Sequence, residues 1–199
     1  MFCITFHELS HGYIAYRLGD NTAKEAGRLT LNPIKHIDVL GLLMMIFVGL
    51  GWAKPVPVNM NNFKKPKQGM AITAFAGPLS NIILSAIIML IYGLAFSTVL
   101  NRDGLGGVIQ QTLLNTAYLS CALAVFNLIP IPPLDGSKVL FSVLPEKAYY
   151  KLMRYEKYGF IIIIVLIWAN ALTPYLKSAI NTMFTWLINI ATWSYSFTV

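Results

Sequence analysis

The sequence predicts an all-α polytopic membrane protein, and two observations support this fold class. Hydrophobic residues make up 56% of the 199 residues and charged residues only 12%, whereas soluble domains carry about 25% charged residues. One soluble core of this chain length cannot bury so much apolar surface, so lipid must cover the rest. The apolar residues are also gathered in long runs between basic connectors. We expect a single membrane-embedded domain over residues 1–199.

About five apolar runs are predicted to be transmembrane helices, because about 20 apolar residues are needed to cross the hydrocarbon core. In chain order they cover residues 1–18, 70–100, 105–129, 158–176 and 178–198. A shorter run at 39–52, VLGLLMMIFVGLGW, predicts a re-entrant or interfacial segment.

Two short stretches between the first and second long runs predict extended strands. GRLTLNP (27–33) and PVPVN (55–59) combine aliphatic residues with the prolines that edge strands tolerate. Paired with each other, they would form a small membrane-associated β-sheet. The edge of such a sheet suggests a hypothesis in which an unwound peptide binds by strand addition.

The charged residues orient the predicted helices. The net charge is +7, and the connector at 19–68 holds seven basic and three acidic residues. The connector at 136–157 holds five basic and two acidic residues, while the turn near 101–104 holds one of each. Both basic connectors should therefore lie in the cytoplasm. Because the basic residues lie between apolar runs, we expect an integral multi-pass membrane protein that binds no nucleic acid.

A metal-binding motif lies in the first apolar run. His7, Glu8 and His11 form the pattern H-E-x-x-H, in which two histidines on one helix face bind a single Zn²⁺. Glu8 would accept a proton from water bound to that zinc, because the metal lowers the pKa of its bound water towards 7. A chance match on an apolar helix is the alternative, but two histidines and a glutamate are costly in a bilayer unless they serve a site.

A catalytic zinc site needs a third protein ligand, and Asp135 is the strongest candidate. It follows Pro130, Pro132 and Pro133 in PIPPLDG, which must break a helix near the cytoplasmic end of a span. Irregular backbone at membrane depth is tolerated where it lines a wet cavity or is buried in protein. Asp135 could instead cap the short helix that follows it, and the spacing alone leaves both roles open.

Two asparagines are candidates for binding the substrate. Asn81 lies eleven residues after Met70, and His7 lies eleven residues before Leu18, so both are placed at similar depth. Asn127 stands just before the proline-rich break. Either amide could hold a substrate backbone or donate to a developing oxyanion. Hydrogen bonding between helices is the alternative role for both.

The motifs together resemble one known family. HELSH, AYRLGD, AGRLTLNPIKHID, GWAKPVPVN, AFAGPLSN and FNLIPIPPLDG follow in that order over residues 6–160 or so. This combination is similar to the site-2 protease family of intramembrane zinc metalloproteases, in particular to its compact prokaryotic group without PDZ or CBS domains.

The resemblance implies a function and a set of site residues. His7, His11 and Asp135 match the zinc ligands of the family, Glu8 its general base, and Asn81 and Asn127 asparagines that line the substrate site. Such proteins hydrolyse peptide bonds within or near transmembrane segments of membrane-protein substrates. We therefore expect a zinc endopeptidase of a prokaryotic cell membrane, with its active site opening towards the cytoplasm.

Two other functions are compatible with parts of the sequence. One is a membrane zinc protease of the prenyl-protein type, whose third ligand is a glutamate on a later helix, but Glu146 and Glu156 lie in the basic connector. The other is a metal-binding membrane transporter or scaffold without hydrolytic activity. In that protein metal would bind and Glu8 would be dispensable.

Overall fold

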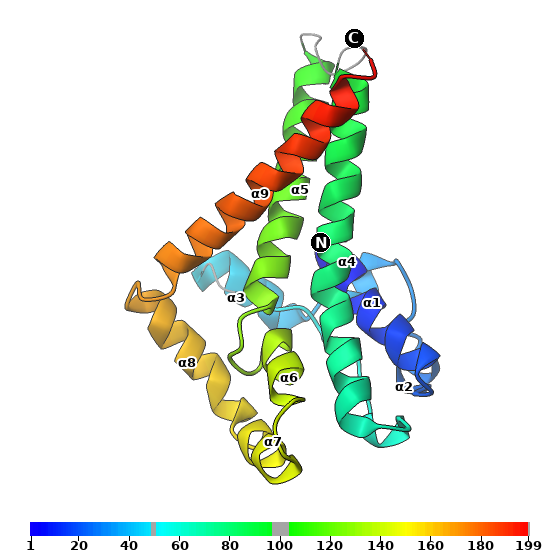
Figure 1. Ribbon diagram of the computed structural model, residues 1–199, viewed down its shortest axis with the longest axis vertical. Coiled ribbons are helices and arrows are strands. Elements are labelled where there is room, and N and C mark those ends of the chain that lie inside the picture. The colour runs from blue at the N-terminus through cyan, green and yellow to red at the C-terminus, as the bar shows by residue number, and fades with distance from the viewer. Residues whose placement is uncertain (49–50, 97–103, 199) are drawn as a thin grey trace. The chain divides into compact units, whose positions relative to one another are not determined.

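A computed structural model describes residues 1–48, 51–96 and 104–198. Most of the turn predicted near 101–104, part of the predicted segment at 39–52 and the end of the predicted span at 70–100 lie outside these residues. The described chain consists of helices and loops (Figure 1), which confirms the all-α prediction. In chain order the helices are α1 (Phe2–Arg17), α2 (Thr22–Glu25), η1 (Pro33–His36), α3 (Val39–Val48), η2 (Met60–Asn62), α4 (Pro66–Ala95), α5 (Leu105–Asn127), α6 (Asp135–Phe141), α7 (Glu146–Met153), α8 (Glu156–Trp168) and α9 (Thr173–Tyr195).

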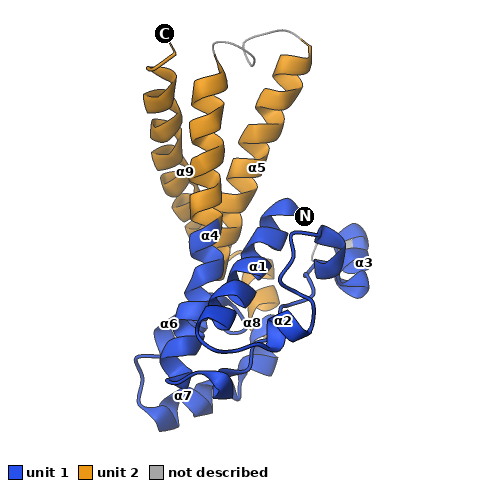
Figure 2. Cartoon of the chain, turned by 90° about the vertical axis from the view of Figure 1, so that its right-hand side faces the viewer, with its two compact units in different colours: residues 1–80, 128–160 blue, residues 81–127, 161–199 orange. Residues whose placement is uncertain are grey.

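The chain forms two compact units (Figure 2). The first unit contains residues 1–80 and 128–160, and the second contains residues 81–127 and 161–199. The first therefore holds α1, α2, η1, α3, η2, α6, α7 and the beginnings of α4 and α8. The second holds α5, α9 and the remainder of α4 and α8.

In the first unit, α1 packs closely against the connector that follows it. A Cβ atom added at Gly12 would lie 2.8 Å from a methyl carbon of Leu29 and 3.0 Å from one of Val56. The absence of a side chain at Gly12 thus lets the connector approach the helix backbone. The helix ends at Arg17, and Gly19 with φ +106° turns the chain back.

A buried carboxylate, that of Asp20, ties this turn to a later part of the connector. Asp20 accepts hydrogen bonds from the backbone N–H of Asn59 (2.7 Å), the side-chain amide of Asn62 (2.7 Å), and both the N–H and the hydroxyl of Thr22. Burial alone would raise the pKa of the Asp20 carboxyl, but these hydrogen bonds outweigh burial and hold the pKa below its ordinary value. The ionised Asp20 carboxylate therefore stabilises the folded state.

We expect Asp20→Asn to destabilise the protein by about 1–3 kcal/mol near neutral pH, because buried donors lose a charged acceptor. Since the folded-state pKa is lowered, the stabilisation is present above the unfolded-state pKa of about 3.9 and is lost as the pH falls through the folded-state value. The difference between parent and variant should therefore shrink below about pH 4. Thermal unfolding in detergent across this pH range, monitored by tryptophan fluorescence, measures this difference in stability.

Asp38→Asn is the matched control, because it is the same substitution at the start of a helix. The Asp38 carboxylate accepts a hydrogen bond from the Gly41 N–H there (2.8 Å). Asparagine caps helices about as well as aspartate, so this variant should unfold close to the parent. Equal losses in both variants would show that the Asp20 network contributes nothing specific.

The prediction of five spanning helices is not supported. Among the described residues, α4 and α5 are long and apolar enough to cross a membrane, with mean hydropathy of 2.0 and 1.2 over their best windows. A third span results only if α8 and α9, which are bent by 89° at their junction, count as one. Helix α1 has 16 residues and is thus about 24 Å long, short of the roughly 30 Å hydrocarbon core.

The junction of α8 and α9 lies earlier than predicted. A helix was expected to run to residue 176, but α8 ends at Trp168. Asn170 adopts φ +54°, and the Ala171 N–H donates to the Leu166 carbonyl (3.0 Å), which closes the helix end. Pro174 then stands in the first turn of α9, where its missing N–H costs nothing.

The predicted β-sheet is also not supported, because the described residues contain no strand. A backbone hydrogen bond from Lys54 N–H to His36 O (3.0 Å) links residues next to the two predicted strands. Pro55 and Pro57 have no N–H and cannot extend it into a ladder. The Arg28 side chain holds the segment instead, donating to Lys54 O (2.6 Å).

In the second unit, small residues let the helices pack closely. The Ser85 hydroxyl of α4 donates to the Ala117 carbonyl of α5 (2.7 Å), and the Ser120 hydroxyl donates to Asn81 O (2.9 Å). A Cβ atom at Gly93 would lie 2.1 Å from the Ala191 carbonyl of α9. Small interfacial residues of this kind are typical of helices that pack in membranes.

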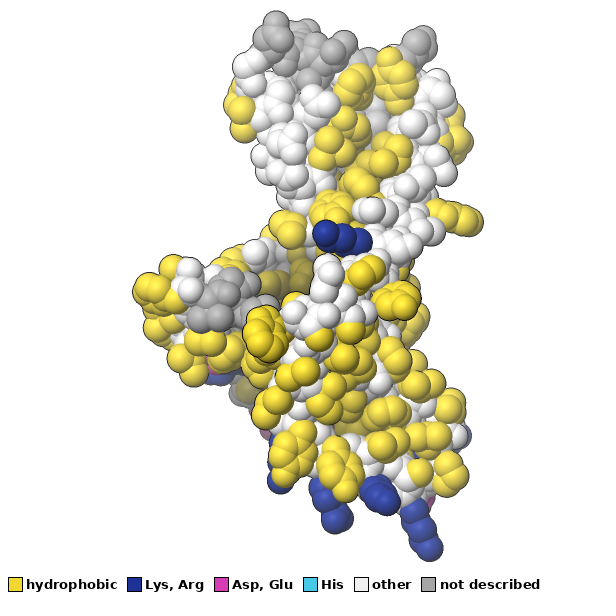
Figure 3. All heavy atoms as spheres, turned by 90° about the vertical axis from the view of Figure 1, so that its left-hand side faces the viewer, with side chains coloured by type: hydrophobic (Ala, Val, Ile, Leu, Met, Phe, Trp, Pro, Cys, Tyr) yellow, Lys and Arg dark blue, Asp and Glu magenta, His cyan; other side chains and the backbone are white. Residues whose placement is uncertain are grey.

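Exposed apolar side chains cover much of α8, and basic residues are exposed in and around α7. Figure 3 shows hydrophobic side chains over the face of α8, with lysines and arginines gathered at the lower end of the view. The exposed basic residues of α7 and its surroundings are Lys147, Lys151, Arg154 and Lys157. Exposed apolar residues next to basic ones are typical of helices that meet lipid and its polar interface.

Candidate metal centre

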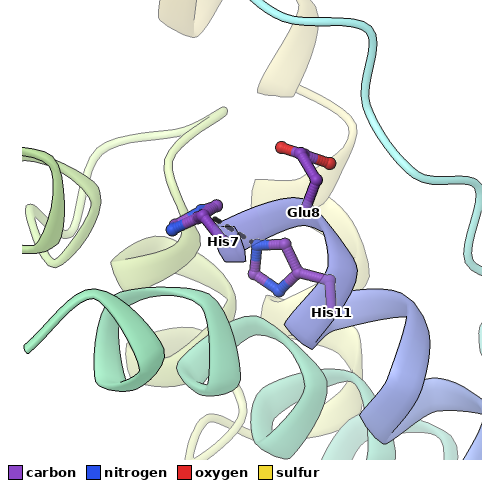
Figure 4. A group of neighbouring side chains, drawn as sticks. All are labelled: His7, Glu8 and His11. Carbon is purple, nitrogen blue, oxygen red and sulfur yellow. Dashed lines mark hydrogen bonds between the residues drawn. The ribbon is translucent and has the colours of Figure 1, made fainter. Parts of the chain in front are cut away.

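Helix α1 carries the H-E-x-x-H residues, of which both histidines are buried. His7 and His11 are 6% and 9% exposed, and one helical turn brings their rings together (Figure 4). Their Nε2 atoms lie 3.0 Å apart, and the two rings are nearly perpendicular. The local periodicity of one helix is therefore enough to place two imidazole nitrogens around one point.

Asp135 joins the two histidines from a distant part of the chain. Its Oδ2 atom lies 3.1 Å from His7 Nε2 and 3.1 Å from His11 Nε2. Asp135 is the first residue of α6 and is 8% exposed. The loop before it passes close to the helix at Gly136, where a Cβ atom would lie 2.1 Å from the Leu128 carbonyl. Because Gly136 has no side chain, the Leu128 carbonyl can lie close to the start of α6, next to Asp135.

These three donor atoms fit a zinc ion. Two ligands about 2.0–2.1 Å from zinc and at tetrahedral angles to each other lie about 3.3–3.4 Å apart. The three distances between the His7, His11 and Asp135 atoms are 3.0, 3.1 and 3.1 Å. Imidazole and carboxylate are also ligand types that catalytic zinc uses, in sets of three with an open fourth position. Both the chemistry and the spacing of the donors therefore suit this metal.

Helix α4 fixes the orientation of His11. The Nδ1 atom of His11 lies 2.7 Å from the Thr73 carbonyl oxygen, which can only accept a hydrogen bond. Nδ1 therefore carries the proton, and Nε2 keeps the lone pair that a metal needs. Gly77, one turn further along α4, leaves room for both rings: a Cβ atom there would lie 2.4 Å from His11 Cε1 and 2.6 Å from His7 Cε1.

We expect Gly77→Ala to impair the centre without removing any donor atom. The new methyl group must displace α4 or both imidazoles, since carbon atoms do not approach this closely. Zinc affinity should fall by about 10–100-fold, as when the support of a metal ligand is lost. Competition with a chelator of known affinity measures this. Gly107→Ala is the control, because a Cβ atom there meets nothing within 4 Å; equal affinity in both variants would contradict the packing argument.

The carboxylate of Glu8 lies beside the centre and is held from another direction. Figure 4 shows the Glu8 side chain leaving α1 next to the two histidines, and ligand-type atoms of the three residues lie within 4.8 Å of one another. Glu8 Oε2 accepts a hydrogen bond from the Val56 N–H (2.8 Å). Pro55 and Pro57 flank Val56 and have no N–H. The Val56 N–H is therefore the one backbone donor in residues 55–57, and it fixes the Glu8 carboxylate.

The two predicted substrate-binding asparagines belong to the second unit. Asn81 is buried, and its backbone carbonyl accepts from Ser120 (2.9 Å). Asn127 is half-buried and donates from its side-chain amide to the Leu123 carbonyl one turn earlier (2.9 Å). Their roles towards a substrate stay predictions.

Sequence reasoning missed three supports of the centre: the carbonyl of Thr73, the N–H of Val56 and the small size of Gly77. The first two are backbone atoms, which every residue carries, so no residue type marks them. Gly77 had a signal, because a Gly-Pro pair inside a long apolar helix suggests a close approach by a neighbour.

Two imidazoles and a carboxylate around one point, with a second carboxylate beside them, are the groups that a metal-dependent hydrolase uses. Residues 99–170 match the sequence profile of Peptidase family M50. A Bacillus subtilis protein named "Putative zinc metalloprotease YwhC" is 43% identical over 172 residues, which cover 81% of this chain and 74% of the relative. The chain belongs to this peptidase family, and the predicted resemblance is confirmed.

Two further relatives agree. "Putative zinc metalloprotease Rip2" of Mycolicibacterium smegmatis is 29% identical over 98% of this chain and 70% of its own length. "Zinc metalloprotease MJ0392" of Methanocaldococcus jannaschii is 30% identical over 74% of this chain and 33% of its own length. No solved structure gives a significant match. The predictions of a metallopeptidase and of zinc as its metal are thus confirmed at the level of the family.

Proposed function

We propose that this protein is an intramembrane zinc endopeptidase that hydrolyses peptide bonds within or near transmembrane segments of other membrane proteins. The observation that carries the proposal is the buried cluster of His7, His11 and Asp135, with the Glu8 carboxylate beside it. The cluster belongs to a chain whose helices α4 and α5 are apolar enough to cross a membrane. Hydrolytic groups set in such a chain suit substrates that also lie in the bilayer.

His7, His11 and Asp135 would hold the zinc ion through Nε2, Nε2 and Oδ2. The chemistry that a bound zinc supplies is a lowered pKa of its coordinated water, towards 7, and polarisation of the scissile carbonyl. Glu8 accepts the proton of the attacking water and delivers it to the leaving amine. The Val56 N–H orients the Glu8 carboxylate for both transfers.

Asn81 and Asn127 are proposed to bind the substrate backbone or to donate to the developing oxyanion. Asn81 follows Gly77 by one turn along the sequence of α4, and helical periodicity supports this proposal. The two units would then act as one membrane-embedded protease domain.

The basic connectors support a cytoplasmic opening of the site, because lysine and arginine collect on that side of a membrane. The connector after α1 carries Val56, whose N–H binds Glu8. The segment after α6 carries the exposed basic residues of the first unit. Water would reach the centre from this side. The substrate helix must unwind there, since its backbone is otherwise hydrogen-bonded within itself.

Cleavage of single-span substrates in lipid nanodiscs tests the proposal. We expect products cut within or close to the apolar segment, located by mass spectrometry, with activity lost on chelation and restored by zinc. Cleavage only of soluble unfolded polypeptides would contradict the intramembrane specificity. Stoichiometric zinc without cleavage of any substrate would favour the transporter or scaffold instead.

A further inference from the structure

A small apolar cavity lies beside α1 in the first unit. Its walls come from Ile4 of α1, Leu42 and Met45 of α3, and Trp52 and Ala53 of the segment that follows α3. Its volume is about 60 Å³. The metal centre does not use this space, and no residue of the H-E-x-x-H motif lines it.

The two polar side chains at the cavity already form hydrogen bonds within the protein. The Asp38 carboxylate accepts from the Gly41 N–H (2.8 Å), and His36 Nε2 donates to the Thr30 carbonyl (2.9 Å). Water in a cavity needs two to four polar partners, and cavities without them stay dry and bind apolar groups. The lining thus favours an apolar occupant.

Two of the segments that line the cavity also carry Glu8 and its hydrogen-bond partner. Ile4 precedes Glu8 by one turn on the same face of α1, a rise of about 6 Å. Ala53 precedes Val56, whose N–H binds Glu8, in the same segment. A rise of about 6 Å corresponds to about two residues of an extended peptide, so a peptide at the metal centre can place a nearby side chain here.

The volume limits what can enter. A water-sized group needs about 10–15 Å³ of such space, so 60 Å³ admits about four carbon-sized groups. Valine, leucine and isoleucine side chains have this size. A phenylalanine ring and a lipid acyl chain are both larger than this space, so the volume favours the aliphatic side chains.

We propose that this cavity is a specificity pocket that binds one medium-sized aliphatic side chain of the substrate, within about two residues of the scissile bond. The inference rests on the proposed protease function and adds to it the side chain that the enzyme prefers. An aliphatic side chain in the pocket helps to hold the unwound peptide in register with Glu8.

A substrate scan tests the pocket. Each position around the mapped cleavage site is changed in turn to Ala, Leu and Phe, and kcat/KM is measured. At one position the parent should prefer Leu over Ala by about tenfold or more. Leu42→Phe fills the cavity and should reverse this preference, whereas Leu42→Ala enlarges it and should raise the rate for Phe relative to Leu by about tenfold. Ala53→Leu is a second filling variant.

Leu43 supplies the matched control. It neighbours Leu42 on α3, does not line the cavity and is 45% exposed. Leu43→Phe and Leu43→Ala should keep the parent's preferences, and zinc content shows that each variant is folded. If the parent cleaves but neither filling variant changes the ratio of kcat/KM between the Leu, Ala and Phe substrates, the cavity is not a specificity pocket. The protease function then still stands. If the parent cleaves no substrate, both fall.

Discussion

Glu8→Gln is expected to lower kcat for a transmembrane substrate by about 10²–10⁴-fold, the usual contribution of a general base, while zinc stays bound. Glutamine keeps the size of the side chain and can still accept from the Val56 N–H, but it cannot take a proton from water. His7, His11 and Asp135 keep their positions, so their affinity for zinc should not change. Single-turnover cleavage and metal analysis by mass spectrometry measure the two quantities.

Glu25→Gln is the control for this change, because Glu25 is an exposed residue of the connector after α1. It removes the same charge and should leave kcat within about twofold, as surface changes away from the site do. Full activity of Glu8→Gln would rule out the general-base role. Zinc-loaded protein with full metal transport and no cleavage in either form would point to the alternative function.

The arrangement of the candidate metal centre was predictable where one helix or one motif determined it. His7, Glu8 and His11 follow from helical spacing alone, because neighbours three and four apart share a face. Asp135 stands 128 residues from His7, so spacing along the chain says nothing about their distance. Only the proline-rich break before it and the family resemblance singled it out. Its approach to the histidines is a property of the whole first unit.

The fold was predictable in class and less so in detail. Apolar runs indicate helices in lipid, but the number of spans depends on where each run bends. At Asn170 a single residue in the left-handed conformation ends α8 inside a stretch that is otherwise largely apolar. The prediction of strands failed for a different reason. Prolines at 55 and 57 suit an extended edge, but the same prolines remove the donors that a second strand would pair with.

Asp135→Asn is expected to abolish cleavage through loss of metal, not through loss of proton transfer. Asparagine keeps the shape of the side chain but removes the negative charge that completes a set of two neutral imidazoles. Loss of a group that only supports a ligand costs about 10–100-fold in metal affinity, so we expect loss of the ligand itself to cost more than about 100-fold. Competition with a chelator at fixed pH gives the affinity, and residual cleavage should return only at high zinc.

Glu156→Gln is the matched control in the same unit, because Glu156 forms only a partly exposed ion pair with Lys138 (3.9 Å). Such pairs contribute little, so zinc affinity should stay at the parent value. If Asp135→Asn also binds zinc as the parent does, then Asp135 is not a ligand. His7, Glu8 and His11, whose ligand-type atoms lie within 4.8 Å of one another, would then be the remaining set. In that case Glu8→Gln should lose zinc, so metal content in the two variants distinguishes an aspartate ligand with a glutamate base from a glutamate ligand.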